Sequence, residues 1–107
     1  AVTGALLREG FDVRAALTGE AGLALAKKEA PDLILLDIVL PEKDGFAVLE
    51  ELKKDPITAR IPVIIMSNLE GSEDVQKALE RGATTYLVKM NYKLEEVVEK
   101  IKSVLAA

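Results

Sequence analysis

The sequence predicts an α/β protein built as a three-layer doubly wound parallel sheet. Short apolar runs at residues 33–36, 63–66 and 86–88 alternate along the chain with longer segments of helical periodicity. The first two runs are continuously apolar, which is typical of strands that are buried on both faces of a parallel sheet. Right-handed crossovers between such strands place helices on both faces.

Length and composition bound the class of protein. The chain has 107 residues, half of them apolar, which is enough for one domain with a core. The absence of Cys and His excludes disulfides, thiolate or imidazole metal sites and a histidine base. The net charge is −4 and there is no basic patch, which argues against a nucleic-acid partner. Without an apolar run of about 18 residues or a signal peptide, we expect a cytoplasmic protein with no membrane partner.

The first third of the chain predicts a helix, a strand and a second helix. Residues 5–9 have helical character, and residues 11–16 alternate in polarity as an edge strand does. Thr18 is suited to cap a helix that runs to about residue 30, where Pro31 ends it. The buried strand at residues 33–36 follows.

A turn-rich loop leads from that strand to the next helix. We assign Asp44 and Gly45 to turn and helix-entry roles rather than to ligand binding. The helix ends near Asp55, and Pro62 opens the second buried strand, where proline is tolerated.

The last third of the chain predicts two helices around one strand. Ser72 is suited to cap the first helix, and Gly82 stands where a left-handed residue ends it. The strand at residues 86–88 follows. The final helix has an apolar stripe formed by Leu94, Val97, Val98, Ile101 and Leu105.

Three polar side chains follow the three inner strands. Asp37 comes after the strand at 33–36, Ser67 after the strand at 63–66, and Lys89 after the strand at 86–88. Each alone is more often a cap or a solvated residue. Ligands of open α/β sheets bind at the carboxyl ends of the strands, so the conjunction of the three predicts a site.

A carboxylate, a hydroxyl and an ammonium suit phosphoryl chemistry. The Asp37 carboxylate can attack phosphorus and form an aspartyl phosphate. Lys89 and Ser67 can then neutralise and hydrogen-bond the phosphoryl oxygens, and a divalent metal such as Mg²⁺ can hold the remaining charge.

These motifs resemble the receiver domains of two-component response regulators. Residues 33–45 (LILLDIVLPEKDG) are similar to the phosphoacceptor segment, residues 64–68 (IIMSN) to the switch strand, and residues 82–89 (GATTYLVK) to the closing segment. Asp37, Ser67 and Lys89 are spaced 30 and 22 residues apart, as in that family. The resemblance covers residues 1–107 as a single receiver domain and implies the flavodoxin-like strand order 2-1-3-4-5.

The resemblance implies a role for each site residue. Asp37 would accept the phosphoryl group, and Ser67 and Lys89 would bind it. Asp37 and the backbone carbonyl of Val39 would hold Mg²⁺. Ser67 and Tyr86 would form the switch, with Tyr86 turning inward when Ser67 moves. The alternative for Tyr86 is ordinary strand packing with its hydroxyl at the surface.

The resemblance also implies the partners. A histidine kinase or phosphotransfer protein would donate the phosphoryl group, and an output effector domain or target protein would read the changed surface. That surface comprises the helix from Ser72, the strand at Tyr86 and the helix from Leu94, and a dimer is a further expectation. The chain would then be a phosphoacceptor and not a turnover enzyme.

Other functions remain open. The runner-up is a degenerate receiver that binds proteins without phosphorylation. A phosphatase with an aspartate nucleophile is disfavoured because Val39 stands where such an enzyme has its general acid. A flavodoxin-like cofactor binder is disfavoured because no glycine-rich phosphate loop is present.

The sequence departs from the family at two places. The first strand and the acidic pair that follows it have no counterpart, so we expect an N-terminally incomplete domain with a weakened metal site. A segment outside the sequence, another chain or a re-paired sheet would then have to fill the gap. Met90 replaces the usual proline after the lysine, so we expect a trans peptide bond there and a differently aimed Lys89.

Overall fold

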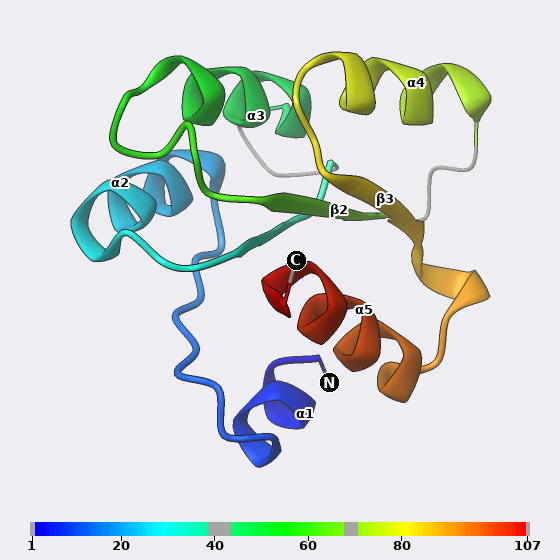
Figure 1. Cartoon of the computed structure of the whole chain (residues 1–107). Helices are drawn as coiled ribbons and strands as arrows, with labels where there is room; N and C mark the ends of the chain where they lie inside the picture. Colours follow the sequence, from blue (N-terminus) through cyan, green and yellow to red (C-terminus); the bar gives the residue numbers. More distant parts are fainter. Residues whose placement is uncertain (1, 39–43, 68–70, 107) are drawn as a thin grey trace.

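Three parallel strands form one sheet between two layers of helices in the computed structural model, which describes residues 2–38, 44–67 and 71–106 (Figure 1). The strands are β1 (Ile34–Leu36), β2 (Val63–Ser67) and β3 (Thr85–Val88), in the order β1-β2-β3. Leu36 pairs with Ile65, and Ser67 pairs with Val88. The predicted α/β class and the three inner strands are therefore confirmed.

Helices pack on both faces of this sheet. Its helices are α1 (Val2–Arg8), α2 (Gly19–Glu29), α3 (Gly45–Lys54), α4 (Ser72–Glu80) and α5 (Leu94–Ala106), with a short 3-10 helix η1 (Lys89–Asn91) before α5. One face of the sheet is covered by α2, α3 and α4, and the other by α1 and α5 (Figure 1). The three-layer arrangement thus follows from apolar strands that need cover on both sides.

The β2 strand lies at the centre of the core because its side chains alternate between the two faces. Val63 and Ile65 pack against α2, α3 and α4, whereas Ile64 packs against α5. All three residues are fully buried. In α5, Val97 and Ile101 are buried as predicted, and the two ends of the stripe are more than a third exposed.

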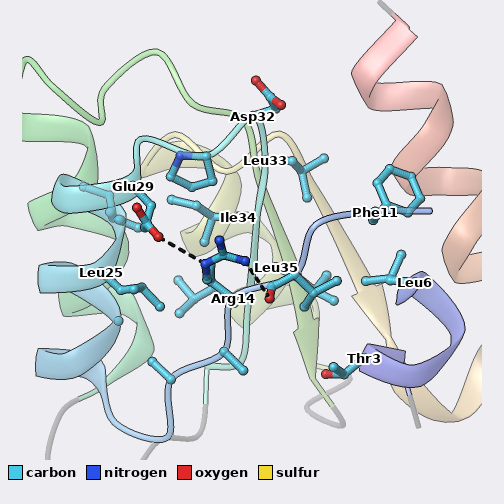
Figure 2. A pocket seen from close by; sticks show the side chains of 18 of the residues that line it. Thr3, Leu6, Phe11, Arg14, Leu25, Glu29, Asp32, Leu33, Ile34 and Leu35 are labelled. Atoms are coloured by element: carbon cyan, nitrogen blue, oxygen red, sulfur yellow. Dashed lines mark hydrogen bonds and ion pairs between the residues drawn. The ribbon is translucent and has the colours of Figure 1, made fainter. Parts of the chain in front are cut away.

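The predicted edge strand at residues 11–16 is absent, and this prediction is wrong. These residues carry no regular secondary structure, and no backbone hydrogen bond joins them to β1 within the described part of the chain. A strand exists only when its backbone groups find a partner. A cavity lies between this segment and β1 (Figure 2), so the alternating pattern has no strand to pair with.

The helix boundaries confirm most of the predicted caps. The Thr18 hydroxyl accepts a hydrogen bond from the Ala21 amide at 3.2 Å, and Asp44 caps α3 through the Phe46 amide at 2.9 Å. Gly82 has φ of +103°, as expected for the residue after α4. The assignment of Ser72 as a cap is wrong. Ser72 is the first helical residue, and the cap position belongs to Gly71, which lacks a side chain.

Candidate functional site

The site lies where the three parallel strands end. Asp37 follows β1 directly, Ser67 is the last residue of β2, and Lys89 follows β3 as the first residue of η1. Parallel strands direct their carboxyl ends to the same edge of a sheet, so local strand boundaries alone bring these residues to one edge. The predicted convergence of the three elements is therefore present in the structure.

Asp37 and Lys89 form an ion pair at this edge. The Lys89 Nζ lies 2.8 Å from Asp37 Oδ2, although the two residues are 52 positions apart in the chain. Their side chains are 33% and 41% exposed, so both are open to a ligand from solvent. An exposed pair of this kind contributes at most about 1 kcal/mol to stability. Its importance is chemical, because it places a cation against the carboxylate of the candidate nucleophile.

The presence of Met90 after Lys89, in place of the usual proline, does not remove this contact. The described residues contain no cis peptide bond, so the expected trans bond is confirmed. Lys89 begins the unpredicted turn η1 and still reaches Asp37. The expected difference in the aim of Lys89 therefore does not keep it from Asp37.

Ser67 and Tyr86 form the second contact at the site. Ser67 is 1% exposed, and a side-chain hydrogen bond joins it to Tyr86. Tyr86 is half-buried and packs against the core cluster shared by α2, α3 and α4. Tyr86 thus contacts both the core cluster and the buried Ser67 side chain.

The surroundings of Tyr86 change the pKa of its hydroxyl. Burial raises the pKa of the Tyr86 hydroxyl above its ordinary value of 10.0, the hydrogen bond from Ser67 opposes this, and the negative charges of Asp74 and Asp37 add to the rise. The folded chain thus holds this proton more tightly than the unfolded chain does.

We expect this shift to appear as alkaline instability. Because the folded pKa is raised, the stabilising contribution is complete below the unfolded pKa of about 10 and is lost as pH rises through the folded pKa. In Tyr86→Phe, the free energy of unfolding should fall less steeply with pH above about 10. Urea denaturation at several alkaline pH values measures this. Equal slopes for the two proteins would contradict the assignment.

Gly45, which the sequence predicts for a turn and helix entry, begins α3 and also lies against the backbone of the candidate site. Its amide donates a hydrogen bond to the Ile38 carbonyl at 2.9 Å. A Cβ at this position would lie 2.4 Å from Ile38 Cα and 2.6 Å from the Asp37 carbonyl oxygen. The start of α3 therefore packs directly on the backbone of the candidate nucleophile, and only glycine permits that approach.

The described residues do not by themselves fit a Mg²⁺ site. Mg²⁺ is held by several oxygen ligands, usually including carboxylates. In the ranges that the structure describes, no group of three acidic side chains could hold a metal. Asp37 is paired with Lys89, and Asp44 caps α3. Val39, the proposed carbonyl ligand, lies outside the described residues.

The described part of the chain also contains no helix that is long and apolar enough to cross a membrane.

Comparison with known proteins agrees with this geometry. Residues 1–102 match the family described as the response regulator receiver domain. The chain is 43% identical over 84 residues to the response regulator PleD of Caulobacter vibrioides, and 38% identical over 105 residues to the protein PilH of Pseudomonas aeruginosa. These alignments cover 78% and 98% of this chain, and 18% and 86% of the two relatives. The chain thus spans less than a fifth of the length of PleD.

Solved structures share the fold over nearly the whole chain. A CheY-like receiver domain protein from Methanospirillum hungatei superimposes with a TM-score of 0.90 at 30% identity, covering 98% of this chain and 82% of that one. The CheX-CheY-BeF3-Mg²⁺ complex from Borrelia burgdorferi gives 0.86 at 29% identity, covering 96% and 77%. In both cases the solved chain is longer than this one.

Proposed function

The chain belongs to the family of response regulator receiver domains, and from this membership we propose that it accepts a phosphoryl group on Asp37. Receiver domains act in two-component signalling as phosphoacceptors rather than as turnover enzymes. The observation that supports the proposal is the 2.8 Å contact between Asp37 and Lys89 at the carboxyl edge of the sheet. It supplies a nucleophile and a charge-neutralising group in one place.

The reaction transfers a phosphoryl group from a phosphohistidine of a partner protein. An Asp37 carboxylate oxygen attacks phosphorus, a P–O bond forms, and the P–N bond to the histidine breaks. The electron pair of that bond stays on the imidazole, which takes up a proton from solvent. The donor histidine lies outside residues 1–107, because these contain no His. A histidine kinase or a phosphotransfer protein has the required chemistry.

Lys89 and Ser67 hold the transferred group in this proposal. The Lys89 ammonium leaves the Asp37 carboxylate and pairs instead with the phosphoryl oxygens, because these carry more negative charge. The Ser67 hydroxyl donates a hydrogen bond to another phosphoryl oxygen. Mg²⁺ would add charge neutralisation if further ligands completed its site. No step above depends on it.

Movement of Ser67 toward the phosphoryl group would transmit the signal. Ser67 is hydrogen-bonded to Tyr86, so the two side chains must rearrange together. Tyr86 lies on β3 between α4 and α5, and the surface formed by these three elements would carry the change to an output domain or target protein.

A second candidate function is a protein-binding module that needs no phosphorylation. It is favoured by the incomplete metal site, because the described residues offer Asp37 without a cluster of further carboxylates. Such a module would keep the fold and the output surface and would lose only the ability to accept a phosphoryl group.

Mass spectrometry after incubation with phosphoramidate and Mg²⁺ tests the proposal. We expect the chain to gain one phosphoryl group that is stable in acid and labile in base. Asp37→Asn should abolish the gain because it removes the nucleophile. Asp32→Asn is the matched control, since Asp32 is an exposed aspartate that precedes β1 at the opposite edge of the sheet, and it should leave the gain unchanged.

Three outcomes of this experiment are distinguishable. An adduct on the wild type and on Asp32→Asn, but not on Asp37→Asn, supports phosphoryl acceptance. No adduct on the wild type overturns it and leaves the binding module. An adduct that persists in Asp37→Asn would show that another residue is the acceptor.

A further inference from the structure

Two side-chain contacts join α3 to α4, which lie side by side on one face of the sheet (Figure 1). The Lys77 ammonium on α4 lies 4.3 Å from the centroid of the Phe46 ring on α3. Arg81, directly after α4, pairs through its Nε with the Glu50 carboxylate on α3. The two α3 residues are one helical turn apart, as are Lys77 and Arg81, so the helices run in the same direction. The contact of Lys77 is at the end of α3 that begins next to Asp37.

Phe46 connects this contact to the backbone of the candidate nucleophile. Its side chain is 7% exposed, and the preceding residue is Gly45. The Gly45 amide donates to the Ile38 carbonyl at 2.9 Å, and a Cβ on Gly45 would lie 2.6 Å from the Asp37 carbonyl oxygen. So close an approach leaves the start of α3 little freedom relative to Asp37. A displacement of Phe46 is therefore passed to the Asp37 backbone.

The charge of Lys77 is directed to this ring. Three acidic residues lie three or four positions from Lys77 in the sequence, where helical ion pairs can form: Glu73, Asp74 and Glu80. Among the residues that the structure describes, no ion pair joins any of them to Lys77. A cation within about 6 Å of an aromatic centroid is attracted by the negative face of the ring. The ammonium therefore holds the ring of Phe46 in one orientation.

The other end of α4 is attached to α3 without Lys77. Arg81 pairs with Glu50, and a Cβ on Gly82 would lie 3.0 Å from Lys53 Cγ, so the backbone after α4 packs on the Lys53 stem. The Lys53 ammonium in turn donates to the Ile61 carbonyl at 2.8 Å. Loss of the Lys77 contact would therefore loosen the two helices mainly at the end next to Asp37.

We propose that Lys77 is a positioning residue, which acts through Phe46 and Gly45 to fix the place of the Asp37 carboxylate. This inference rests on the proposed phosphoryl acceptance at Asp37. Lys77 takes no part in bond making or proton transfer. Its effect is geometric, because a misplacement of about 1 Å at a reacting group can cost about 100-fold in rate.

Removal and restoration of the charge at residue 77 test the inference in the 107-residue chain. Lys77→Gln keeps a polar helix-forming side chain and removes the cation, so we expect phosphoryl acceptance from phosphoramidate with Mg²⁺ to slow about threefold or more. Lys77→Arg keeps a cation that can lie over the ring and should restore the rate to within about twofold of the wild type. Mass spectrometry at successive times measures each rate.

Arg81→Gln is the matched control. It makes the same kind of change one helical turn along and removes the other contact between α3 and α4. Because that contact is an exposed ion pair distant from Gly45, the rate should stay within about twofold of the wild type. The control therefore separates a specific effect of Lys77 from a general loosening of the two helices.

A double-mutant cycle identifies the partner of Lys77. Phe46→Leu keeps an apolar side chain and removes the aromatic face. In this background, Lys77→Gln should cause no further loss of rate, because the contact on which it acts is already gone. If Phe46→Leu does not fold, the comparison of Lys77→Gln with Lys77→Arg and Arg81→Gln decides.

Amide NMR spectra of the unphosphorylated protein give a readout that does not need the reaction. Lys77→Gln should shift the amide signals of Gly45 and Ile38, and Lys77→Arg should return them toward the wild-type positions. Arg81→Gln should leave both signals in place. These signals report the backbone that carries Asp37.

The outcomes keep the inference distinct from the proposed function. If the wild type gains no phosphoryl group, the proposed function fails, and the Gly45 and Ile38 amides alone decide whether Lys77 positions this backbone. Unchanged rate and unchanged amides in Lys77→Gln would overturn the inference. So would an equal loss of rate in Lys77→Arg or in Arg81→Gln, because neither a general surface effect nor a general loosening depends on the cation over Phe46.

Discussion

Gly45→Ala is expected to destabilise the chain by about 1–3 kcal/mol and to slow the proposed phosphoryl acceptance on Asp37 about 100-fold. The added Cβ would lie 2.4 Å from Ile38 Cα and 2.7 Å from the Ile38 carbonyl oxygen, and both are backbone atoms. Backbone cannot move aside as the end of a flexible side chain can. The chain must therefore shift either α3 or the residues that carry the Asp37 carboxylate.

Gly4→Ala is the matched control, with the opposite expected sign. Gly4 lies in α1, and its added Cβ would meet only Arg8 Nη1 at 3.5 Å, an ordinary contact with a flexible side chain. Alanine in a helix is more stable than glycine by about 1 kcal/mol, so this variant should be slightly stabilised. Urea denaturation and the rate of adduct formation measure both effects. A Gly45→Ala protein with wild-type stability and rate would show that the close approach of α3 does not matter.

Local sequence signals account for most of the fold. The continuous apolar runs of β1 and β2 identify buried parallel strands, because both faces of such strands need cover. Thr18 and Asp44 mark helix starts since their side-chain oxygens satisfy amides that have no helical partner. Gly82 marks a helix end because its φ of +103° is readily adopted by glycine and not by residues with a side chain. These signals act within a few residues and can be recognised in a single sequence.

The error at residues 11–16 has a different origin. The alternating pattern is a correct description of a segment that prefers to be a strand. Whether the strand forms depends on a partner that is distant in sequence, and here the neighbouring position beside β1 is a cavity. The polarity pattern predicts the conformation that a segment prefers, whereas hydrogen bonding to a neighbouring strand decides whether a strand forms.

The sequence predicts the part of the candidate site that follows from the order and direction of the strands. Strand ends bring Asp37, Ser67 and Lys89 to one edge, and this required no side-chain detail. The role of Gly45 depends on the close approach of α3 to Ile38, which sequence spacing does not reveal. Lys89 contacts Asp37 although Met90 follows it in place of the usual proline, and Lys89 is the first residue of η1. That turn has no strong sequence signal.

Leu49→Ala is expected to lower the free energy of unfolding by about 2–5 kcal/mol. Leu49 lies in α3 with no exposed surface, and it belongs to the cluster that joins α2, α3 and α4 to the sheet. Truncation removes its apolar contacts and leaves a cavity that the surrounding helices fill only in part. Small domains are stable by about 5–15 kcal/mol, so this single change removes a large share.

The open edge of β1 makes the same variant more informative. Backbone groups of Leu35 lack strand partners within the described part of the chain, so we expect the free energy of unfolding of the wild type to lie in the lower part of that range. Leu49→Ala should then lower the urea midpoint steeply, whereas Leu79→Ala, at a residue that is 46% exposed, should change stability by about 0.5 kcal/mol or less. Equal effects at the two leucines would mean that α3 is not packed on the sheet as described, and the positions of Gly45 and Asp37 would then need revision.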